Sequence, residues 1–359
     1  MNKGFWEKLP RPIVGLSPMD GVTDSPMRFI AKKYGRPDVI YTEFVSVDGL
    51  WRVEKQGETT HKIWNELKFD ESEHPIVAQL FGSDPDSFYE ATKIVAKMGF
   101  DGIDINMGCP SPGLEKRGGG AGLMRDFGLA HGVIEAVRKG AGEIPVSVKT
   151  RIGSSAPEPD WWKFLAGEEL PCVAMHGRTF KQLYSGKADW EALKEAAKII
   201  KESGALFLGN GDVEKISIVD NGSECEKSVL DTSPEYRAVP LRANFSGTPA
   251  PVTIGYLDGV LIGRAAIGNP WALRRDGYEP SVEKKLKVAV EHARKFEELF
   301  LPAGPGPAGR GRFEAMRKHL AWYAHGFPGA GGLRRKLVQT NSADEVEKII
   351  GEYLDTAVN

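Results

Sequence analysis

The sequence contains few cysteines, and their spacing excludes a disulfide framework. Its 359 residues include three, Cys109, Cys172 and Cys225. A low, odd count without paired spacing is typical of a reducing compartment and argues against a disulfide-rich secreted domain. No Cys-x-x-Cys pair and no His-x-x-x-His pair occurs, so the sequence predicts no metal site.

Long apolar runs and a net excess of charge are also missing. No run of about 18 apolar residues occurs, so we predict no membrane span and no membrane association. The first twelve residues mix basic and acidic side chains, so we expect no signal peptide and a cytoplasmic location. The formal net charge is −2, so binding to nucleic acid would require a local basic face.

The chain does contain a regular alternation of short apolar runs and longer amphipathic stretches. Helices are expected between the runs, notably at 25–34, 85–98, 129–139 and 190–203. Eight buried strands separated by helices predict an α/β fold, and the count favours a closed (β/α)₈ TIM barrel over an open sheet. The expected strands are residues 13–16, 39–42, 75–80, 102–106, 145–149, 172–175, 205–208 and 259–262.

Two regions depart from this alternation. Residues 214–256 separate the last two strands, where one short helix would suffice, so we expect such a helix plus an extra surface excursion. From residue 281 the pattern becomes helical, with helices expected at 282–300, 313–323 and 343–357 and a Pro/Gly-rich connector at 301–311. The predicted domains are therefore a barrel, 1–276, and a C-terminal helical domain, 281–359.

Polar residues follow seven of the predicted strands, and a barrel would gather them at one mouth. The segments 209–212 and 263–264, which include Gly211 and Arg264, follow the last two strands, where TIM barrels usually bind phosphate. Lys149 and His176 follow the fifth and sixth strands, and a cation there would stabilise a reduced flavin. The mouth therefore suits a ligand that carries both a flavin ring and a phosphate.

A cysteine lies on a turn at the same mouth. Cys109 stands in Asn106-Met107-Gly108-Cys109-Pro110, just after a strand and before a glycine-rich segment, 118–122, that we expect to be a mobile loop. Free cysteines are more often buried structural residues, but this position favours a catalytic one. Cys172 lies within an apolar strand and is expected in the core, and Cys225 carries no chemical signal.

Seven motifs together resemble the tRNA-dihydrouridine synthase family, in the family's order and at roughly its spacing. The resemblance covers residues 13–273, and the segment 316–329 resembles that family's helical domain. The motifs are Ser17-Pro18-Met19-Asp20-Gly21-Val22-Thr23-Asp24, the segment 106–110, Lys149-Thr150-Arg151-Ile152-Gly153, His176-Gly177-Arg178-Thr179, the segment 184–190, Gly209-Asn210-Gly211-Asp212 and the segment 262–271.

The resemblance implies an enzyme that uses FMN and NADPH to reduce the C5–C6 double bond of uridines in tRNA. It implies that Cys109 is the general acid and that Asn106, Arg151 and Tyr184 approach the uracil. It also implies that the flavin contacts Pro18, Met19, Gln79, Lys149, His176, Asn210, Asp212, Gly263 and Arg264. The chain departs from the family pattern in the excursion at 214–256, which is longer by roughly 20 residues than the connection between two barrel strands in the family.

A basic segment in the helical domain favours tRNA as the partner. Residues 310–336 contain seven Arg and Lys residues and one acidic residue, which suits contacts to phosphates. We expect a monomer without an obligate protein partner. Two alternatives remain at this point: another FMN barrel that acts on a free pyrimidine, such as a dihydroorotate or dihydropyrimidine dehydrogenase, and a non-catalytic tRNA-binding module.

Overall fold

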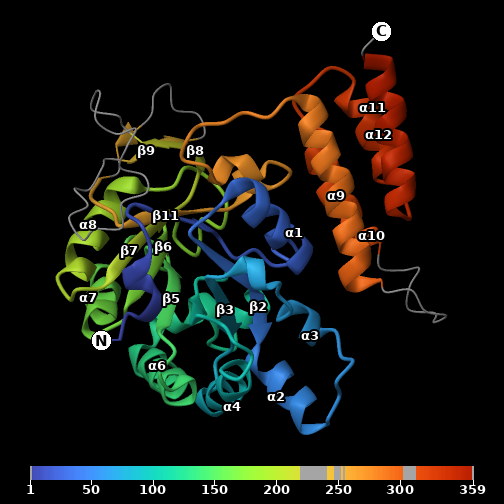
Figure 1. Ribbon diagram of the computed structural model, residues 1–359. Helices are drawn as coiled ribbons and strands as arrows, with labels where there is room; N and C mark the ends of the chain where they lie inside the picture. Colours follow the sequence, from blue (N-terminus) through green and yellow to red (C-terminus); the bar gives the residue numbers. More distant parts are fainter. Residues whose placement is uncertain (1, 219–240, 246–251, 254, 302–312, 358–359) are drawn as a thin grey trace.

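The computed structural model describes residues 2–218, 241–245, 252–253, 255–301 and 313–357, and its centre is a closed barrel of eight parallel strands (Figure 1). β1 closes the ring by pairing with β2 on one side and β11 on the other. The predicted TIM barrel is therefore confirmed. Its strands are β1 (Ile13–Leu16), β2 (Val39–Ser46), β3 (Ile76–Phe81), β4 (Gly102–Met107), β5 (Val146–Arg151), β6 (Cys172–His176), β7 (Leu206–Asn210) and β11 (Gly259–Ile262).

Helices surround the barrel, and several begin at an aspartate. Asp24, Asp84, Asp126 and Asp189 each accept a hydrogen bond from the backbone N–H three residues on, which satisfies a donor that the first helical turn leaves free. Of the helices found, α2, α3, α5 and α7 are not among those that the sequence predicts. The helices are α1 (Ser25–Ile30), α2 (Val47–Lys55), α3 (Ile63–Glu66), α4 (Pro85–Val95), α5 (Pro112–Glu115), α6 (Phe127–Ala141), α7 (Pro159–Gly167) and α8 (Trp190–Lys201).

The interior of the barrel is closed at its N-terminal end by the start of the chain. Trp6 is fully buried and packs in one apolar cluster with Ile13, Tyr41 and Cys172. Cys172 is therefore a core residue, as predicted. Because this end is sealed by side chains, the opposite end of the barrel is the one that can open to a ligand.

The excursion between β7 and β11 contains strands in its described part. β8 (Val213–Ile218) pairs antiparallel with β9 (Leu241–Phe245), and β9 pairs with β10 (Val252–Thr253). The expected helix has no counterpart among these residues, and Cys225 lies outside the described residues. β8 starts directly after the predicted phosphate segment, so the sheet rises from the rim of the barrel mouth.

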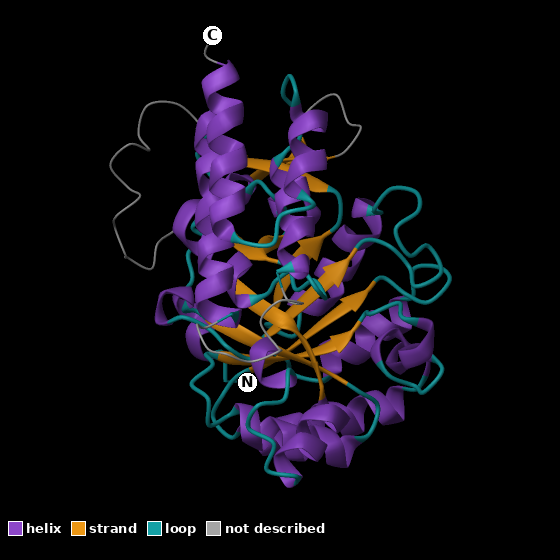
Figure 2. Cartoon of the chain, turned by 90° about the vertical axis from the view of Figure 1, so that its right-hand side faces the viewer, coloured by secondary structure: helices purple, strands orange, loops and turns teal. Residues whose placement is uncertain are grey.

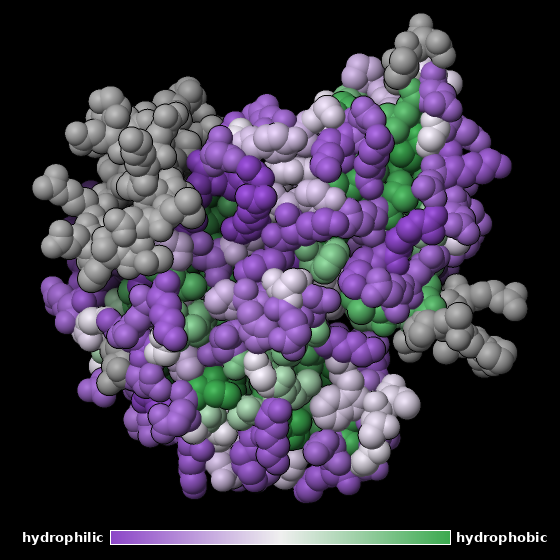
Figure 3. All heavy atoms as spheres, viewed as in Figure 1, coloured by the Kyte–Doolittle hydropathy of each residue, from purple (hydrophilic) through white to green (hydrophobic). Residues whose placement is uncertain are grey.

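The C-terminal helices pack against one side of the barrel and share a core with it (Figures 1 and 2). They are α9 (Val282–Phe300), α10 (Glu314–Tyr323), α11 (Ala330–Leu337) and α12 (Ala343–Ala357); the sequence predicts all but α11. Ile30 of α1 and Trp271 belong to the same apolar cluster as these helices. Figure 3 shows apolar side chains between the C-terminal helices on a face that is otherwise largely hydrophilic. The predicted connector lies mostly outside the described residues.

None of the helices in the described part of the chain combines the length and the apolarity that crossing a bilayer needs.

Candidate active site

A cavity of about 580 Å³ opens at the carboxyl ends of the barrel strands. Parallel strands in a barrel all end at one face, which explains why residues far apart in the sequence meet there. The cavity also takes in Asp20, Phe44 and Glu214, which the sequence analysis does not single out. All fourteen residues predicted for catalysis or binding line it: Pro18, Met19, Gln79, Asn106, Cys109, Lys149, Arg151, His176, Tyr184, Asn210, Gly211, Asp212, Gly263 and Arg264.

The turn that carries Cys109 is held in place by several backbone contacts. Asn106 Oδ1 accepts hydrogen bonds from the N–H groups of Gly108 (3.1 Å) and Cys109 (2.8 Å). The Gly108 carbonyl accepts a bond from Arg151 Nε at 2.8 Å, and the Cys109 carbonyl accepts one from the Ala121 N–H at 3.2 Å. Burial raises the pKa of the Cys109 thiol, so the thiol stays protonated at neutral pH. The wall of the cavity thus presents a fixed, protonated thiol.

The glycine-rich segment after Cys109 is packed, which corrects the expectation of a mobile loop. Residues 119–122 are buried, and Gly120–Arg125 forms a 3₁₀ helix. Gly120 has a φ of 55°, and a Cβ there would lie 2.8 Å from Leu114 Cδ2 and 3.0 Å from the Cys109 carbonyl oxygen. The glycine is needed because two backbone segments approach closely, and this approach supports the Cys109 turn.

A chain of buried hydrogen bonds links the Cys109 turn to the floor of the barrel. Asp104 accepts bonds from Ser147 Oγ (2.6 Å) and Gln79 Nε2 (2.7 Å), and Gln79 Oε1 accepts one from Asn106 Nδ2 (3.0 Å). Asp104 is fully buried, and burial raises its pKa to about 6. A carboxylate only accepts hydrogen bonds, so Asp104 fixes the orientation of both amides above it. The sequence analysis misses Asp104, since it lies within a strand rather than after one.

Lys149 is a half-buried cation without an ion pair in the described part of the chain. Its ammonium makes no hydrogen bond or ion pair there, although it lines the cavity. Burial, with Arg151 nearby, lowers its pKa from the ordinary 10.5 to about 8. A charge that is partly removed from water is normally paired, so a lysine that faces a cavity without an ion pair to the described residues favours a binding site for an electron-rich or anionic group.

His176 faces the same space as a neutral imidazole. Its Nδ1 accepts a hydrogen bond from the Arg178 N–H at 3.2 Å, so Nε2 carries the proton. Burial and the surrounding cations lower its pKa well below the ordinary value, which keeps the ring neutral. His176 therefore offers a hydrogen-bond donor to whatever occupies the cavity.

The predicted phosphate end is built from glycines and arginines. The N–H groups of Gly211 and Gly263 donate no hydrogen bond within the described residues. Gly211 has a φ of 125°, and a Cβ there would lie 2.7 Å from Ala188 Cβ, so this position requires glycine. Asp212 accepts bonds from Arg178 (2.7 Å) and Arg264 (3.0 Å). Its carboxylate therefore positions Arg264. Arg178 supports this arrangement, although it is present in the sequence only as part of the motif 176–179 and is not among the predicted site residues.

The three residues predicted to approach the substrate fall into two groups. Asn106 and Arg151 are buried and are largely engaged with backbone; Arg151 Nη1 bonds the carbonyls of Thr179 and Leu183, each at 3.0 Å. Tyr184 is 62% exposed at the rim, with its ring 5.6 Å from the Arg264 guanidinium carbon. Arg151 Nη2 makes no hydrogen bond to the described residues, so it is the end of this side chain that is free for a ligand.

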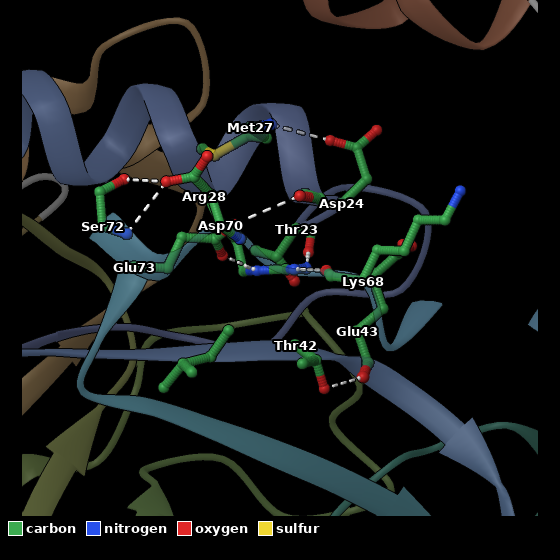
Figure 4. Close-up of polar contacts among 12 residues, drawn as sticks. Thr23, Asp24, Met27, Arg28, Thr42, Glu43, Lys68, Asp70, Ser72 and Glu73 are labelled. Carbon is green, nitrogen blue, oxygen red and sulfur yellow. Dashed lines mark hydrogen bonds and ion pairs between the residues drawn. The ribbon is translucent and has the colours of Figure 1, made fainter. Parts of the chain in front are cut away.

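A buried ion pair supports the loop that carries Pro18 and Met19 (Figure 4). Arg28 Nε lies 2.6 Å from Glu73 Oε2, and both side chains are fully buried. Arg28 Nη1 also donates to the Thr23 carbonyl at 2.7 Å, and Thr23 Oγ1 accepts a bond from the Met19 N–H at 3.0 Å. The ion pair thereby fixes one wall of the cavity, because the loop cannot move without breaking buried bonds.

With this geometry in hand, comparison with known proteins is informative. The model of the dihydrouridine synthase (Dus) family matches residues 15–226 and 253–358. The chain belongs to this family. The match omits 227–252, which lies inside the excursion that the sequence analysis describes as longer than in the family. It extends over the C-terminal helices, so these helices are part of the family's architecture.

Full-length relatives agree with the family assignment. The chain is 32% identical over 358 residues to a probable tRNA-dihydrouridine synthase of Staphylococcus aureus strain Mu50, covering 98% of this chain and 96% of that protein. It is 29% identical over 358 residues to probable tRNA-dihydrouridine synthase 2 of Bacillus subtilis strain 168, covering 98% and 97%. Among solved structures, an old yellow enzyme homologue from Zymomonas mobilis matches with a TM-score of 0.40 and 17% identity, covering 72% of this chain and 86% of that one. A likeness of that size adds nothing to the assignment.

Proposed function

We propose that this protein is a tRNA-dihydrouridine synthase that reduces the C5–C6 double bond of uridines in tRNA, with FMN as its flavin and NADPH as its reductant. The observation that carries the proposal is the convergence, on one cavity, of the Cys109 thiol, of Lys149 without an ion pair to the described residues, and of Gly211 and Gly263 beside Arg264. The barrel, 1–276, performs the chemistry, and the helical part, 281–359, holds the tRNA. Because the substrate is tRNA, we place the enzyme in the cytoplasm.

The cavity fits a flavin mononucleotide at both of its ends. Lys149 and the Nε2–H of His176 suit the electron-rich N1–C2 edge of the ring, and Gln79 suits its other polar edge. The free N–H groups of Gly211 and Gly263, with Arg264, suit the phosphate. When bound and reduced, the flavin supplies the hydride that uracil C6 accepts.

Cys109 donates the proton that completes the reduction. Hydride addition at C6 builds negative charge toward C5 and O4 of the uracil, and the thiol proton then forms the C5–H bond and leaves a thiolate. Solvent restores the thiol proton before the next turnover. The raised pKa of Cys109 keeps the proton available at neutral pH. The bond that Asn106 accepts from the Cys109 N–H and the bond that Arg151 donates to the Gly108 carbonyl hold the turn still during the transfer. The free Nη2 of Arg151 can bond a uracil carbonyl and stabilise the developing charge.

A substrate base must leave its tRNA stack to reach this site. The exposure of Tyr184 at the rim supports a contact with the base on entry. The three consecutive basic residues of α11, Arg334, Arg335 and Lys336, are exposed and make no ion pair with the described residues, so they can bind phosphates. Arg310 and Arg312 of the predicted basic segment lie outside the described residues.

The proton-transfer role is tested with Cys109→Ala and a matched cysteine removal, Cys172→Ala, in the barrel core. We expect C109A to retain flavin and its reduction by NADPH but to lose at least about 100-fold in uridine reduction, within the usual contribution of a general acid. C172A should keep its turnover. Wild-type turnover in C109A, measured in single turnovers with tRNA that lacks dihydrouridine, would refute the role of the thiol.

The tRNA-binding role is best tested by charge reversal on α11. Ending the chain near Asp276 would expose Ile30 and Trp271, which pack against the C-terminal helices, so a truncated protein is a poor probe. Arg334→Glu with Arg335→Glu should weaken tRNA binding and reduce its salt dependence while leaving flavin reduction unchanged. If the variant binds tRNA normally, α11 is not the phosphate contact. Equal turnover of free uridine and tRNA would instead favour the dehydrogenase alternative.

A further inference from the structure

Three buried side chains that the proposed mechanism does not use meet where the helical part packs on the barrel. Asp24 precedes α1, His292 lies on α9 and His319 lies on α10. Each offers one ligand atom, and these atoms all lie within 4.8 Å of one another. The two imidazoles are each 1% exposed, and the rings lie 4.8 Å apart between centroids. Three separate elements therefore bring nitrogen and oxygen donors to one enclosed point.

The other polar atoms of two of these residues are already engaged. Asp24 Oδ1 accepts the capping bond from the Met27 N–H at 2.9 Å (Figure 4). His292 Nδ1 is bonded to the Tyr323 hydroxyl at 3.2 Å. Such contacts orient the ligands of known metal sites, because a fixed Nδ1 leaves Nε2 directed at the metal. These bonds leave Asp24 Oδ2 and His292 Nε2 for a ligand, and His319 turns its Nε2 toward Asp24 Oδ2.

Both Nε2 atoms are buried without a hydrogen-bond partner in the described part of the chain. Leaving a buried polar atom unsatisfied costs about 1–3 kcal/mol, so two such atoms side by side call for an explanation. The cluster thus contains two unused lone-pair donors beside a carboxylate.

The distance between the His319 and Asp24 ligand atoms distinguishes a metal site from a simple hydrogen bond. His319 Nε2 lies 3.5 Å from Asp24 Oδ2. A charge-assisted N–H···O bond would be about 2.7–2.9 Å long. Two ligands of a tetrahedral zinc ion lie about 3.3 Å apart when each bond is about 2.0–2.1 Å. The observed distance is closer to the second value, and His292 offers its ligand atom within 4.8 Å of the other two.

We propose that Asp24, His292 and His319 form a binding site for a divalent transition-metal ion of the zinc class, which ties the helical part to the barrel. Two imidazoles and a carboxylate are the donors that such ions accept, and a water molecule can complete a tetrahedron. No local sequence pattern predicts this site, because its ligands come from positions 24, 292 and 319, at both ends of the chain. The site lies outside the proposed catalytic cavity, so it is structural.

The experiment uses the full-length protein, freed of metal with a chelator and then titrated with Co²⁺ as a visible probe. We expect one Co²⁺ per chain, with the absorption bands of a four-coordinate site, and displacement by Zn²⁺. Zinc at about 100 times its Kd should raise the Tm by several degrees. Asp24→Asn keeps a good helix cap but weakens a ligand, and His319→Asn removes one. Both should lose the bands and the zinc-dependent Tm shift.

The matched control is His325→Asn, an exposed histidine just beyond α10, which should bind Co²⁺ normally. Absence of stoichiometric Co²⁺ and Zn²⁺ binding by the wild-type protein would overturn the proposal. So would binding that persists in both D24N and H319N, since the ion would then sit elsewhere. A Tm loss in D24N that is the same in zinc and in chelator would point to a direct Asp24–His319 hydrogen bond instead. Circular dichroism confirms that each variant is folded.

Discussion

Lys149 should destabilise the protein when the cavity is empty. Its pKa falls from 10.5 to about 8, because burial penalises the charged form. One pKa unit corresponds to about 1.4 kcal/mol, so at neutral pH the charged lysine costs the folded state about 3 kcal/mol. Lys149→Met keeps the length of the side chain and removes the charge. We therefore expect the flavin-free variant to be more stable than the wild type by about 2–3 kcal/mol.

The same substitution should weaken the binding of FMN. A hydrogen bond to a charged group contributes about 1.5–3 kcal/mol, so FMN should bind about 10- to 100-fold more weakly to K149M. Urea denaturation of the flavin-free proteins at pH 7.5 measures the first effect, and quenching of flavin fluorescence measures the second. Lys163→Met, at an exposed lysine, is the control and should change neither quantity by much.

The pH dependence gives an independent check. Between about pH 8 and 10.5 the unfolded lysine holds its proton and the folded one does not, so the unfolded state binds more protons. Stability must then rise with pH in this window, and the rise should be absent in K149M. A flavin-free K149M that is less stable than the wild type, or that binds FMN equally well, would refute the reasoning.

Four further substitutions test the supporting contacts. Arg264→Ala should lower FMN affinity about 10-fold, and unchanged FMN content after dialysis would remove this residue from the phosphate site. Asp104→Asn keeps the acceptor for Gln79 but removes the charge near Lys149, so we expect the pH at which Lys149 titrates, followed through FMN affinity, to fall further. Arg28→Met should lower the free energy of unfolding by about 3–5 kcal/mol in urea, with recovery in a double variant that also replaces Glu73 by Leu. Gly120→Ala should slow uridine reduction while leaving flavin affinity intact, and equal kcat would contradict the packing argument.

The barrel and its mouth can be predicted from the sequence because both depend on local patterns. Apolar runs mark the strands, and β1 and β11 have the predicted bounds, since turn residues flank each run closely. Once eight parallel strands are expected, the residues after them must share one face, so the lining of the cavity follows without knowledge of any contact. This explains why residues as distant as Pro18 and Arg264 are found together.

The other parts of the site and of the fold depend on contacts that no local sequence pattern reveals. Asp104 acts through a partner on another strand, and nothing in its own segment distinguishes it from an ordinary barrel residue. Arg178 stands in one of the seven motifs, but its role depends on the bond to Asp212, which no local pattern reveals. The helix α11 is missed because Gly331 and Gly332 lower its helix propensity, while packing of Leu333 and Leu337 into the C-terminal core stabilises it. In the sequence, the glycines near Cys109 are typical of a flexible loop. In the structure, Gly120 lies so close to the Cys109 carbonyl that a larger residue would not fit.

The pairing of β8 with β9 has a consequence for the length of the chain between them. Ile218 and Leu241, the described residues that flank 219–240, lie opposite each other in this pair. Once its ends are fixed, a longer connection costs only about 0.6 kcal/mol for each doubling of its length. Because β8 and β9 stay paired, a change in the length of 219–240 should leave Asp212 and the cavity rim in the same position. Such a position tolerates insertions and deletions, so it is the place at which we would insert a label or a foreign domain into this enzyme.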